Sequence, residues 1–295
     1  MPTQLPLPAA VLDTDTFNEV DDQFALAHLL LSPSQVNLEA VYAAPFSNDR
    51  AATPAEGMEK SYGEILRVLK LVGGTATQPS VYRGSTTYLN GPRIPVESAA
   101  ARNLVERALA QRQGRLHVLA IGACTNVASA LLMEPKIAGR ITITWLGGHA
   151  PHWSNTDEFN LRQDVHASRV LLDTDAPFLL VPCDPVASHL AVTVPELEAH
   201  LAPYSALGTY LTDIVRAYGN NAPGWSKVIW DIAVSASLIN PKWIRTVEEE
   251  SPLLNDDLTW GDRTDRRKIR IARQLERDAI FADFYTKTKA LGLLA

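Results

Sequence analysis

A short acidic segment, "DTDTFNEVDDQFAL" at residues 13–26, follows the apolar run "LPAAVL" near the start of the chain. Its aspartates stand at positions 13, 15, 21 and 22, and Glu19 adds a fifth carboxylate. Carboxylates this close together repel one another unless a positive charge lies among them. A pair such as Asp15 and Asp22 at the end of a buried strand costs several kcal/mol unless a cation or a proton neutralises it. The segment therefore indicates a bound cation.

Other polar residues follow the remaining apolar runs of the sequence. In open α/β sheets, ligands bind beyond the carboxyl ends of the strands. Loops from five parts of the chain are therefore expected to bring carboxylates, amides and a threonine to one edge. The residues concerned are Asp13 and Asp15, Asn48, Thr125 and Asn126, Glu158 and Asn160, and Asp231.

Several of these residues also have an ordinary structural interpretation. Asp21 and Asp231 stand where a helix N-cap is expected. Asn48 and Asn160 suit turns, and Glu158 in a polar loop suits simple solvation. For these residues the sequence leaves both interpretations open.

The type of ligand indicates the type of metal. Carboxylate oxygens with no Cys or His nearby favour Ca²⁺ or Mg²⁺ over zinc. Calcium prefers six to eight oxygens and accepts backbone carbonyls. A cluster of Asp15, Asp22, Asp231 and one carbonyl would leave positions for water and for substrate hydroxyls.

Apolar runs alternate with longer helical patterns, which is typical of an α/β fold. A mostly parallel central sheet with helices on both faces, a Rossmann-like open sheet, is expected. The strands are expected at 9–13, 38–44, 115–123, 140–148 and 177–183, with late strands at 243–250 and 267–274. The helices are expected at 21–31, 53–73, 125–135, 164–175, 229–241 and 278–292, the second with Thr53 as N-cap and Gly73 as its stop.

The sequence shows no linker or repeat, so one domain over residues 1–295 is expected, with 185–228 as an inserted cap. It contains neither the glycine fingerprint of dinucleotide-binding folds nor a Walker A sequence. The net charge of −6 argues against partners such as nucleic acid or an anionic membrane. Cys124 and Cys183 are too few for a disulfide framework. No apolar stretch of about 20 residues and no signal peptide is present, so a cytoplasmic location is expected.

Four segments in order resemble the nucleoside hydrolase family, of the inosine-uridine preferring type. "DTDTFNEVDDQFAL" resembles the family's aspartate signature D-x-D-P-G-x-D-D-A-x-A. "GACTNVASAL", "EFNLRQDVHASRVLL" and "WDIAVSASL" fit the stretches that follow it. They span residues 13 to about 239, most of the chain. The resemblance implies a nucleoside hydrolase fold and an enzyme that cleaves ribonucleosides to ribose and free base.

The resemblance also implies a role for each site residue. Asp15, Asp22 and Asp231 would bind Ca²⁺ through their carboxylates and Thr125 through its backbone carbonyl. Asp15 would also be the catalytic base that deprotonates the Ca²⁺-bound water. The ribose hydroxyls would be held by Asp21, Asn48, Glu158 and Asn160, with Asp13 behind the ligands to orient them. Homodimers or homotetramers are expected from the same resemblance.

Those residue types suit hydrolysis of an N-glycosidic bond. A metal lowers the pKa of a bound water, and carboxylates near the ring stabilise an oxocarbenium-like transition state. Groups that hydrogen-bond the ribose hydroxyls would reject deoxyribose by up to about 10⁴-fold, because buried polar groups would lose their partners.

Two departures from the family pattern concern the loop and the leaving group. The loop "TFNEV" at 16–20 is two residues longer than usual and lacks the Pro-Gly pair, which either shifts Asp21 and Asp22 or forms a bulge. Trp230 stands where the inosine-uridine type has a histidine that protonates the leaving base. Indole has no such proton to give. Candidate replacements are an acid at His149 or His152, or stacking of a base on Trp230, Trp153 or Trp225.

Two other functions compete with this interpretation. A haloacid-dehalogenase-type phosphatase also begins with D-x-D after an apolar strand, but Phe17 occupies its Thr/Val position and "GDRTD" matches its late acidic motif poorly. A nucleoside- or ribose-binding homologue with little turnover would retain the metal and ribose residues. Release of free ribose separates the hydrolase from the binder.

Overall fold

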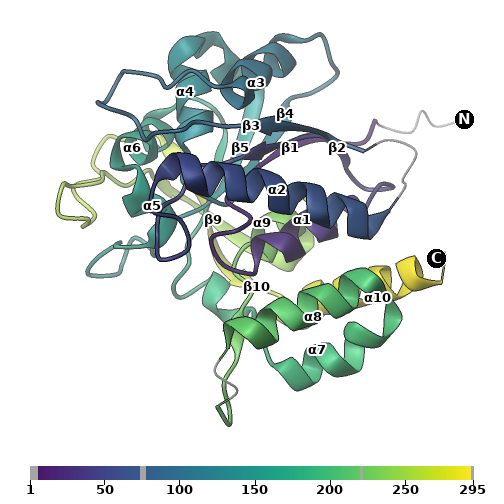
Figure 1. Cartoon of the computed structure of the whole chain (residues 1–295). Coiled ribbons are helices and arrows are strands. Elements are labelled where there is room, and N and C mark those ends of the chain that lie inside the picture. Colours follow the sequence, from purple (N-terminus) through teal and green to yellow (C-terminus); the bar gives the residue numbers. More distant parts are fainter. Residues whose placement is uncertain (1–5, 74–77, 220–221, 294–295) are drawn as a thin grey trace, which may run out of the picture.

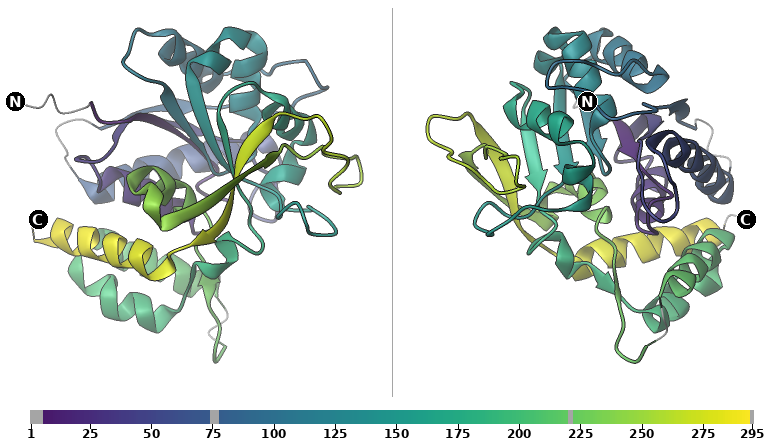
Figure 2. Two further views of the ribbon diagram at one scale, coloured as in Figure 1. Left: turned by 180° about the vertical axis from the view of Figure 1, so that it is seen from behind. Right: turned by 60° about the vertical axis from the view of Figure 1, so that its left-hand side comes forward.

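The computed structural model describes residues 6–73, 78–219 and 222–293. Its main sheet has the strand order β3-β2-β1-β4-β5-β6-β10-β9, and only the β9–β10 pair is antiparallel (Figures 1 and 2). The strands are β1 (Ala9–Thr14), β2 (Asn37–Ala43), β3 (Ser80–Arg83), β4 (Leu116–Ala120), β5 (Ile141–Leu146), β6 (Phe178–Val181), β9 (Ile244–Glu250) and β10 (Lys268–Leu275). The expected mostly parallel α/β sheet is confirmed.

Helices cover both faces of this sheet, and each face has its own apolar core. Helices α1, α2 and α9 pack on one face and α3, α4 and α6 on the other (Figure 1). The helices are α1 (Asp22–Leu30), α2 (Pro54–Val72), α3 (Ala99–Leu109), α4 (Thr125–Met133), α5 (Phe159–Gln163), α6 (Val165–Asp173), α7 (Val194–His200), α8 (Ala206–Tyr218), α9 (Ile232–Ile239) and α10 (Arg277–Gly292). Short 3₁₀ turns lie at Pro135–Gly139, Ala187–His189, Ala202–Tyr204 and Pro241–Trp243.

The expected helices and strands are present, with ends that differ by a few residues. Thr53 caps α2 by accepting from the backbone N–H of Glu56, and Gly73 ends it at φ +77°. Strand β3 and the helices α3 and α5 were not predicted. Both free cysteines are buried. Within the described ranges, no helix has the length and apolar content that would let it cross a membrane.

The segment 185–228 forms α7, α8 and a two-stranded ribbon of β7 (Ala191–Val192) and β8 (Lys227–Val228). Figures 1 and 2 show α7 and α8 beside the C-terminal helix α10, below the sheet. Leu197, Leu207 and Leu211 from this segment share one apolar cluster with Phe281 and Phe284 of α10. The expected cap is therefore packed into the core of the α1 face.

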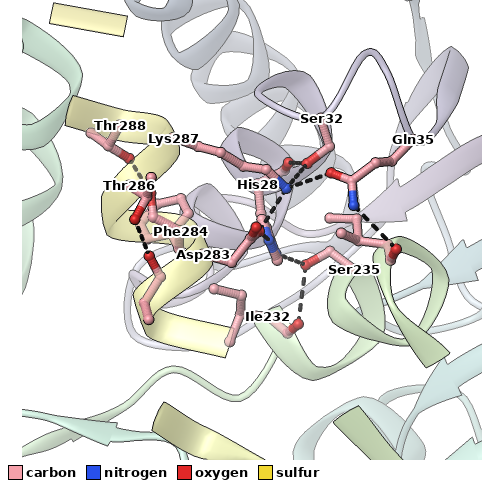
Figure 3. A network of polar contacts seen from close by, with 12 residues as sticks. His28, Ser32, Gln35, Ile232, Ser235, Asp283, Phe284, Thr286, Lys287 and Thr288 are labelled. Atoms are coloured by element: carbon pink, nitrogen blue, oxygen red, sulfur yellow. Dashed lines mark hydrogen bonds and ion pairs between the residues drawn. The ribbon is translucent and has the colours of Figure 1, made fainter. Parts of the chain in front are cut away.

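A buried polar network joins α1, α9 and α10 (Figure 3). His28 Nδ1 lies 3.0 Å from Ser235 Oγ on α9, and its Nε2 lies 2.9 Å from Asp283 Oδ2 on α10. Lys287 Nζ donates to the same aspartate and to Ser32 and Gln35. Burial lowers the pKa of His28, so the ring is neutral and donates one proton to Asp283.

Replacing His28 by alanine is expected to lower the free energy of unfolding by about 2–4 kcal/mol, because it opens a cavity and removes two buried hydrogen bonds. Urea unfolding monitored by circular dichroism measures this change. Thr286→Ala on the exposed face of α10 is the control and should stay within about 0.5 kcal/mol of the wild type. If His28→Ala lowered the free energy of unfolding no more than the control does, the network would not be important for stability.

Candidate active site

A cavity of about 250 Å³ lies beyond the carboxyl ends of the central strands. The strand order reverses between β1 and β4, and ligands of open α/β sheets bind at such a point. Seven of the predicted site residues line the cavity, whereas Asp13, Asn48 and Thr125 do not. The lining residues are Asp15, Asn18, Glu19, Asp21, Asp22, Ile121, Leu146, His149, Asp157, Glu158, Phe159, Asn160, Cys183, Asp184, Trp230 and Asp231.

Three carboxylates at the base of the cavity come from two helix N-termini. Oxygen atoms of Asp21, Asp22 and Asp231 all lie within 4.8 Å of one another, and all three residues are buried. Asp21 and Asp231 occupy the N-cap positions of α1 and α9, but neither side chain makes a capping hydrogen bond. The capping interpretation of these two side chains is therefore wrong, and their carboxylates face the cluster instead.

Within the described residues, no hydrogen-bond donor reaches either carboxylate oxygen of Asp15, although this residue is only 1% exposed. Burial, followed by the charges of Asp22 and Asp21, raises its pKa well above the usual value. An ionised carboxylate in such a place needs a cation. The donor set is made of hard oxygens, and none of the His side chains lies in the cluster, so it fits Ca²⁺ or Mg²⁺.

The backbone beside Asp15 is built to admit its carboxylate. A Cβ atom at Gly122, just after β4, would lie 3.0 Å from Asp15 Cγ. Glycine is required here because of this close approach. Behind Asp15, Asn126 Nδ2 donates to Asp13 Oδ1 at 2.8 Å and to the carbonyl of Ala43 at 3.2 Å. Asn126 therefore fixes Asp13 below the cluster, while Asp13 Oδ2 has no partner.

Thr125 begins α4, and its hydroxyl donates to Asp164 Oδ2 at 2.7 Å. Asp164 also caps α6 and accepts from the backbone N–H of Leu89. The Thr125 hydroxyl is thus engaged by Asp164, so any contact of Thr125 with a metal would have to come from its backbone carbonyl oxygen.

Glu158 and Asn160 form a rigid wall after β5. Glu158 caps α5 by accepting from the N–H groups of Asn160 and Leu161, and it accepts a third bond from Gly148. Its exposure of 9% excludes the simple solvated interpretation. Asn160 Nδ2 donates to the Leu146 carbonyl, which leaves its amide oxygen for the cavity. Asn160 is therefore held by the strand rather than by a turn.

The longer loop folds over the cavity. The Asn18 N–H donates to the Asp15 carbonyl, and Asn18 Oδ1 accepts from Asn48 Nδ2 at 2.7 Å. Arg50 donates to the carbonyls of Phe17 and Glu19. Asn18 and Glu19 both line the cavity, so the loop at 16–20 forms part of its wall. Asn48 supports this wall from behind.

Lys227 is the functional residue that sequence analysis missed. Its Nζ lies 2.5 Å from Glu19 Oε2 and 3.6 Å from Asp21 Oδ1, and the side chain is almost fully buried. Burial alone would lower the pKa of this ammonium, but Asp21 and Glu19 outweigh it and raise the pKa. The signal in the sequence was a single lysine in the apolar run "KVIWD", four residues before Asp231.

Trp230 lines the cavity, and its backbone N–H donates to Asp21 Oδ2 at 3.1 Å. Trp153, Trp225 and His152 are not among the lining residues, and His152 is exposed. His149 lines the cavity, and its Nδ1 accepts from the backbone N–H of Asp184 at 3.3 Å.

Comparison with known proteins gives a consistent picture. The sequence model of the inosine-uridine preferring nucleoside hydrolases matches residues 10–282. The pyrimidine-specific ribonucleoside hydrolase RihA of Salmonella enteritidis is 26% identical over 256 residues, covering 77% of this chain and 79% of the relative. RihA of Klebsiella pneumoniae is 27% identical over 258 residues, with the same coverage.

Solved structures share the fold. A purine-preferring ribonucleoside hydrolase from Gardnerella vaginalis superposes with a TM-score of 0.76 at 21% identity, covering 98% of this chain and all of the other. An inosine-uridine preferring nucleoside hydrolase from Bacillus anthracis gives a TM-score of 0.74 at 15% identity, covering 96% of this chain and all of the other. These matches speak against the phosphatase alternative.

The carboxylate cluster predicts how pH and metal affect stability. Burial raises the pKa of both Asp13 and Asp22 to about 7, well above the unfolded value. Because these two carboxyl groups hold their protons more tightly in the folded state, their contribution to the stability of the fold is complete below about pH 4. This contribution is lost as the pH rises through about 7. The melting temperature of the metal-free protein should fall between pH 5 and pH 8, and added Ca²⁺ should raise it more at pH 8. Thermal melts with and without chelator test this, and a Ca²⁺ effect independent of pH would contradict it.

Removing the Lys227 ammonium should destabilise the folded protein. Lys227→Met leaves Glu19 and Asp21 without their buried counter-charge, so the free energy of unfolding should fall by about 3–5 kcal/mol. Denaturant unfolding measures the change, with Lys242→Met at an exposed position as the matched control. Equal stabilities of the two variants would show that the carboxylates do not need this cation.

Proposed function

Because the chain belongs to the inosine-uridine preferring nucleoside hydrolase family, we propose that it hydrolyses the N-glycosidic bond of ribonucleosides to ribose and free base, with Asp15 as the general base. The main support is Asp15 itself, a buried carboxylate with two unpartnered oxygens beside the cluster of Asp21, Asp22 and Asp231. The curated relatives named as ribonucleoside hydrolases add support.

Ca²⁺ is the proposed metal, held by Asp15, Asp22, Asp231 and the carbonyl of Thr125. When bound, it would acidify and orient the attacking water. Asp21 belongs to the same carboxylate cluster as Asp22 and Asp231. Its two oxygens, however, face the Trp230 N–H and the Lys227 ammonium. Asp15 has no such partners, and this difference favours Asp15 as the ligand and Asp21 as a substrate contact.

The ribose hydroxyls are proposed to bind between Asp21 on one wall and Glu158 and Asn160 on the other. Three backbone N–H groups fix the Glu158 carboxylate, and Leu146 fixes the Asn160 amide, so both are preorganised. Asn48 would contribute indirectly, by holding the Asn18 side chain in the cavity wall. Asp13 would hold its place behind the ligands through Asn126.

In the proposed reaction, a water attacks the anomeric carbon while Asp15 accepts its proton. The bond from this carbon to the base nitrogen breaks with its electron pair moving to the base. The sugar gains positive charge in the transition state, and the carboxylates of Asp21 and Glu158 stabilise it. Trp230 would lie against the departing base.

The wider setting also stays a proposal. We place the enzyme in the cytoplasm, in nucleoside salvage, as a homodimer or homotetramer that acts on a small molecule. The net charge of −6 supports the absence of a nucleic-acid partner. Light scattering on the purified protein would test the oligomeric state.

Asp15→Asn should abolish activity. Loss of the base and of a metal ligand is expected to lower kcat by about 10⁴-fold or more. Reducing-sugar release from a panel of ribonucleosides measures this, with and without a Ca²⁺ chelator, and Asp278→Asn at an exposed position is the control. Chelation should remove the activity of the wild type. A wild type that binds Ca²⁺ and ribose but releases no sugar would identify a binding protein instead of an enzyme.

A further inference from the structure

The outer end of the cavity is where the leaving base must lie, once the metal and ribose residues are assigned. The lining residues that remain partly exposed are Glu19, His149, Asp157, Phe159, Asp184 and Trp230. This set, the cavity rim, combines two aromatic rings, three carboxylates and one imidazole. Its chemistry bears on which bases can leave.

Among the described residues, no group at the rim is well suited to protonate a base. Trp230 has an indole, whose N–H is not acidic. His149 accepts a hydrogen bond at Nδ1 from the backbone N–H of Asp184, so this nitrogen has no proton to give to a base. Lys227 lies close, but its ammonium is engaged by Glu19, Asp21 and the Val228 carbonyl. A neutral base that leaves without a proton carries away a negative charge.

The rim carboxylates would repel such an anion. Asp157 and Asp184 have side chains 52% and 34% exposed, and Glu19 is 35% exposed. The opposing cations are Arg162, 3.2 Å from Asp157 and 5.6 Å from the Phe159 ring, and Lys227 beside Glu19. Asp184 Oδ2 lies 3.9 Å from His149 Nδ1. Within the described residues, no Lys or Arg nitrogen lies within 4 Å of the Asp184 carboxylate, and the aromatic rings of the rim favour a positive charge.

We propose that the preferred substrates are ribonucleosides whose base carries a fixed positive charge, such as N-alkylated purine or pyridinium ribosides. This inference rests on the proposed hydrolysis. When the glycosidic bond breaks, its electron pair moves to the positively charged ring nitrogen, and the base leaves neutral. Water supplies the oxygen at the anomeric carbon, and its proton passes through Asp15 to solvent. No acid is needed for this leaving group. The same rim disfavours nucleotides, whose phosphate is anionic.

The first experiment compares adenosine with 7-methyladenosine, which differ in the fixed charge of the base. Since a general acid contributes about 10²–10⁴-fold, kcat/KM for 7-methyladenosine should exceed that for adenosine by about 10²-fold or more. Trp230→His introduces an imidazole at the rim. It should raise kcat for adenosine by about tenfold, so the ratio of kcat for 7-methyladenosine to kcat for adenosine should fall.

The second experiment separates the charge of the rim from the reactivity of the substrate. Nicotinamide riboside and nicotinic acid riboside share a pyridinium leaving group, but the second adds a carboxylate. KM should be about tenfold lower for nicotinamide riboside, and Asp184→Asn should narrow this difference. Asp173→Asn, at an exposed position outside the cavity, is the matched control and should leave the difference unchanged.

The outcomes separate this inference from the proposed function. Equal kcat/KM for adenosine and 7-methyladenosine, or equal KM for the two pyridinium ribosides, would overturn the preference for a cationic base. The proposed hydrolase activity would be unaffected by that result. No sugar release from any of the four substrates would overturn both.

Discussion

The structure depends on one electrostatic constraint, the burial of several carboxylates at the carboxyl end of the central strand β1. Asp15, Asp21, Asp22 and Asp231 are each at most 4% exposed. Burial and mutual repulsion raise the pKa of each of them, so the isolated cluster favours protons over charge. Lys227 supplies one fixed positive charge on the side of Asp21 and Glu19. Among the residues that the structure describes, no Lys, Arg or His nitrogen lies within 4 Å of Asp15, Asp22 or Asp231, and Ca²⁺ is the proposed counter-charge there.

The fold holds these repelling groups together by fixing the two helices that carry them. Asp22 is the first residue of α1, and Asp231 caps α9. Both helices direct their N-terminal, partly positive ends at the cluster, which favours negative charge there. One to two turns further along, His28 of α1 contacts Ser235 of α9, and α10 closes the network. The polar network of His28, Ser235 and Asp283 thus helps to fix the two helices, and with them the positions of the acidic side chains.

Much of this arrangement could be predicted from the sequence, because strand ends and helix starts are local signals. Asp15, Asp22 and Asp231 follow or precede apolar runs, and a parallel sheet brings such positions to one edge. Lys227 could not be found in this way, because its partner Glu19 is 208 residues away in the chain. The hydrogen bond between Asn48 and Asn18 could not be predicted either, because it depends on how the longer loop folds. Local patterns identify which residues reach the site, whereas tertiary contacts decide what each residue faces.

The two departures from the family pattern can be understood as one physical change. The longer loop brings Glu19 to the cavity, and this carboxylate engages the Lys227 ammonium close to Asp21. An ammonium paired with two carboxylates and bonded to a carbonyl is a poor acid, since giving up a proton would remove the positive charge that both carboxylates face. Trp230 orders Asp21 through its backbone and adds an aromatic surface through its side chain. Both departures therefore add contacts around Asp21, on the proposed ribose side, and place an indole instead of an imidazole on the proposed base side, which suits a base that needs no proton to leave.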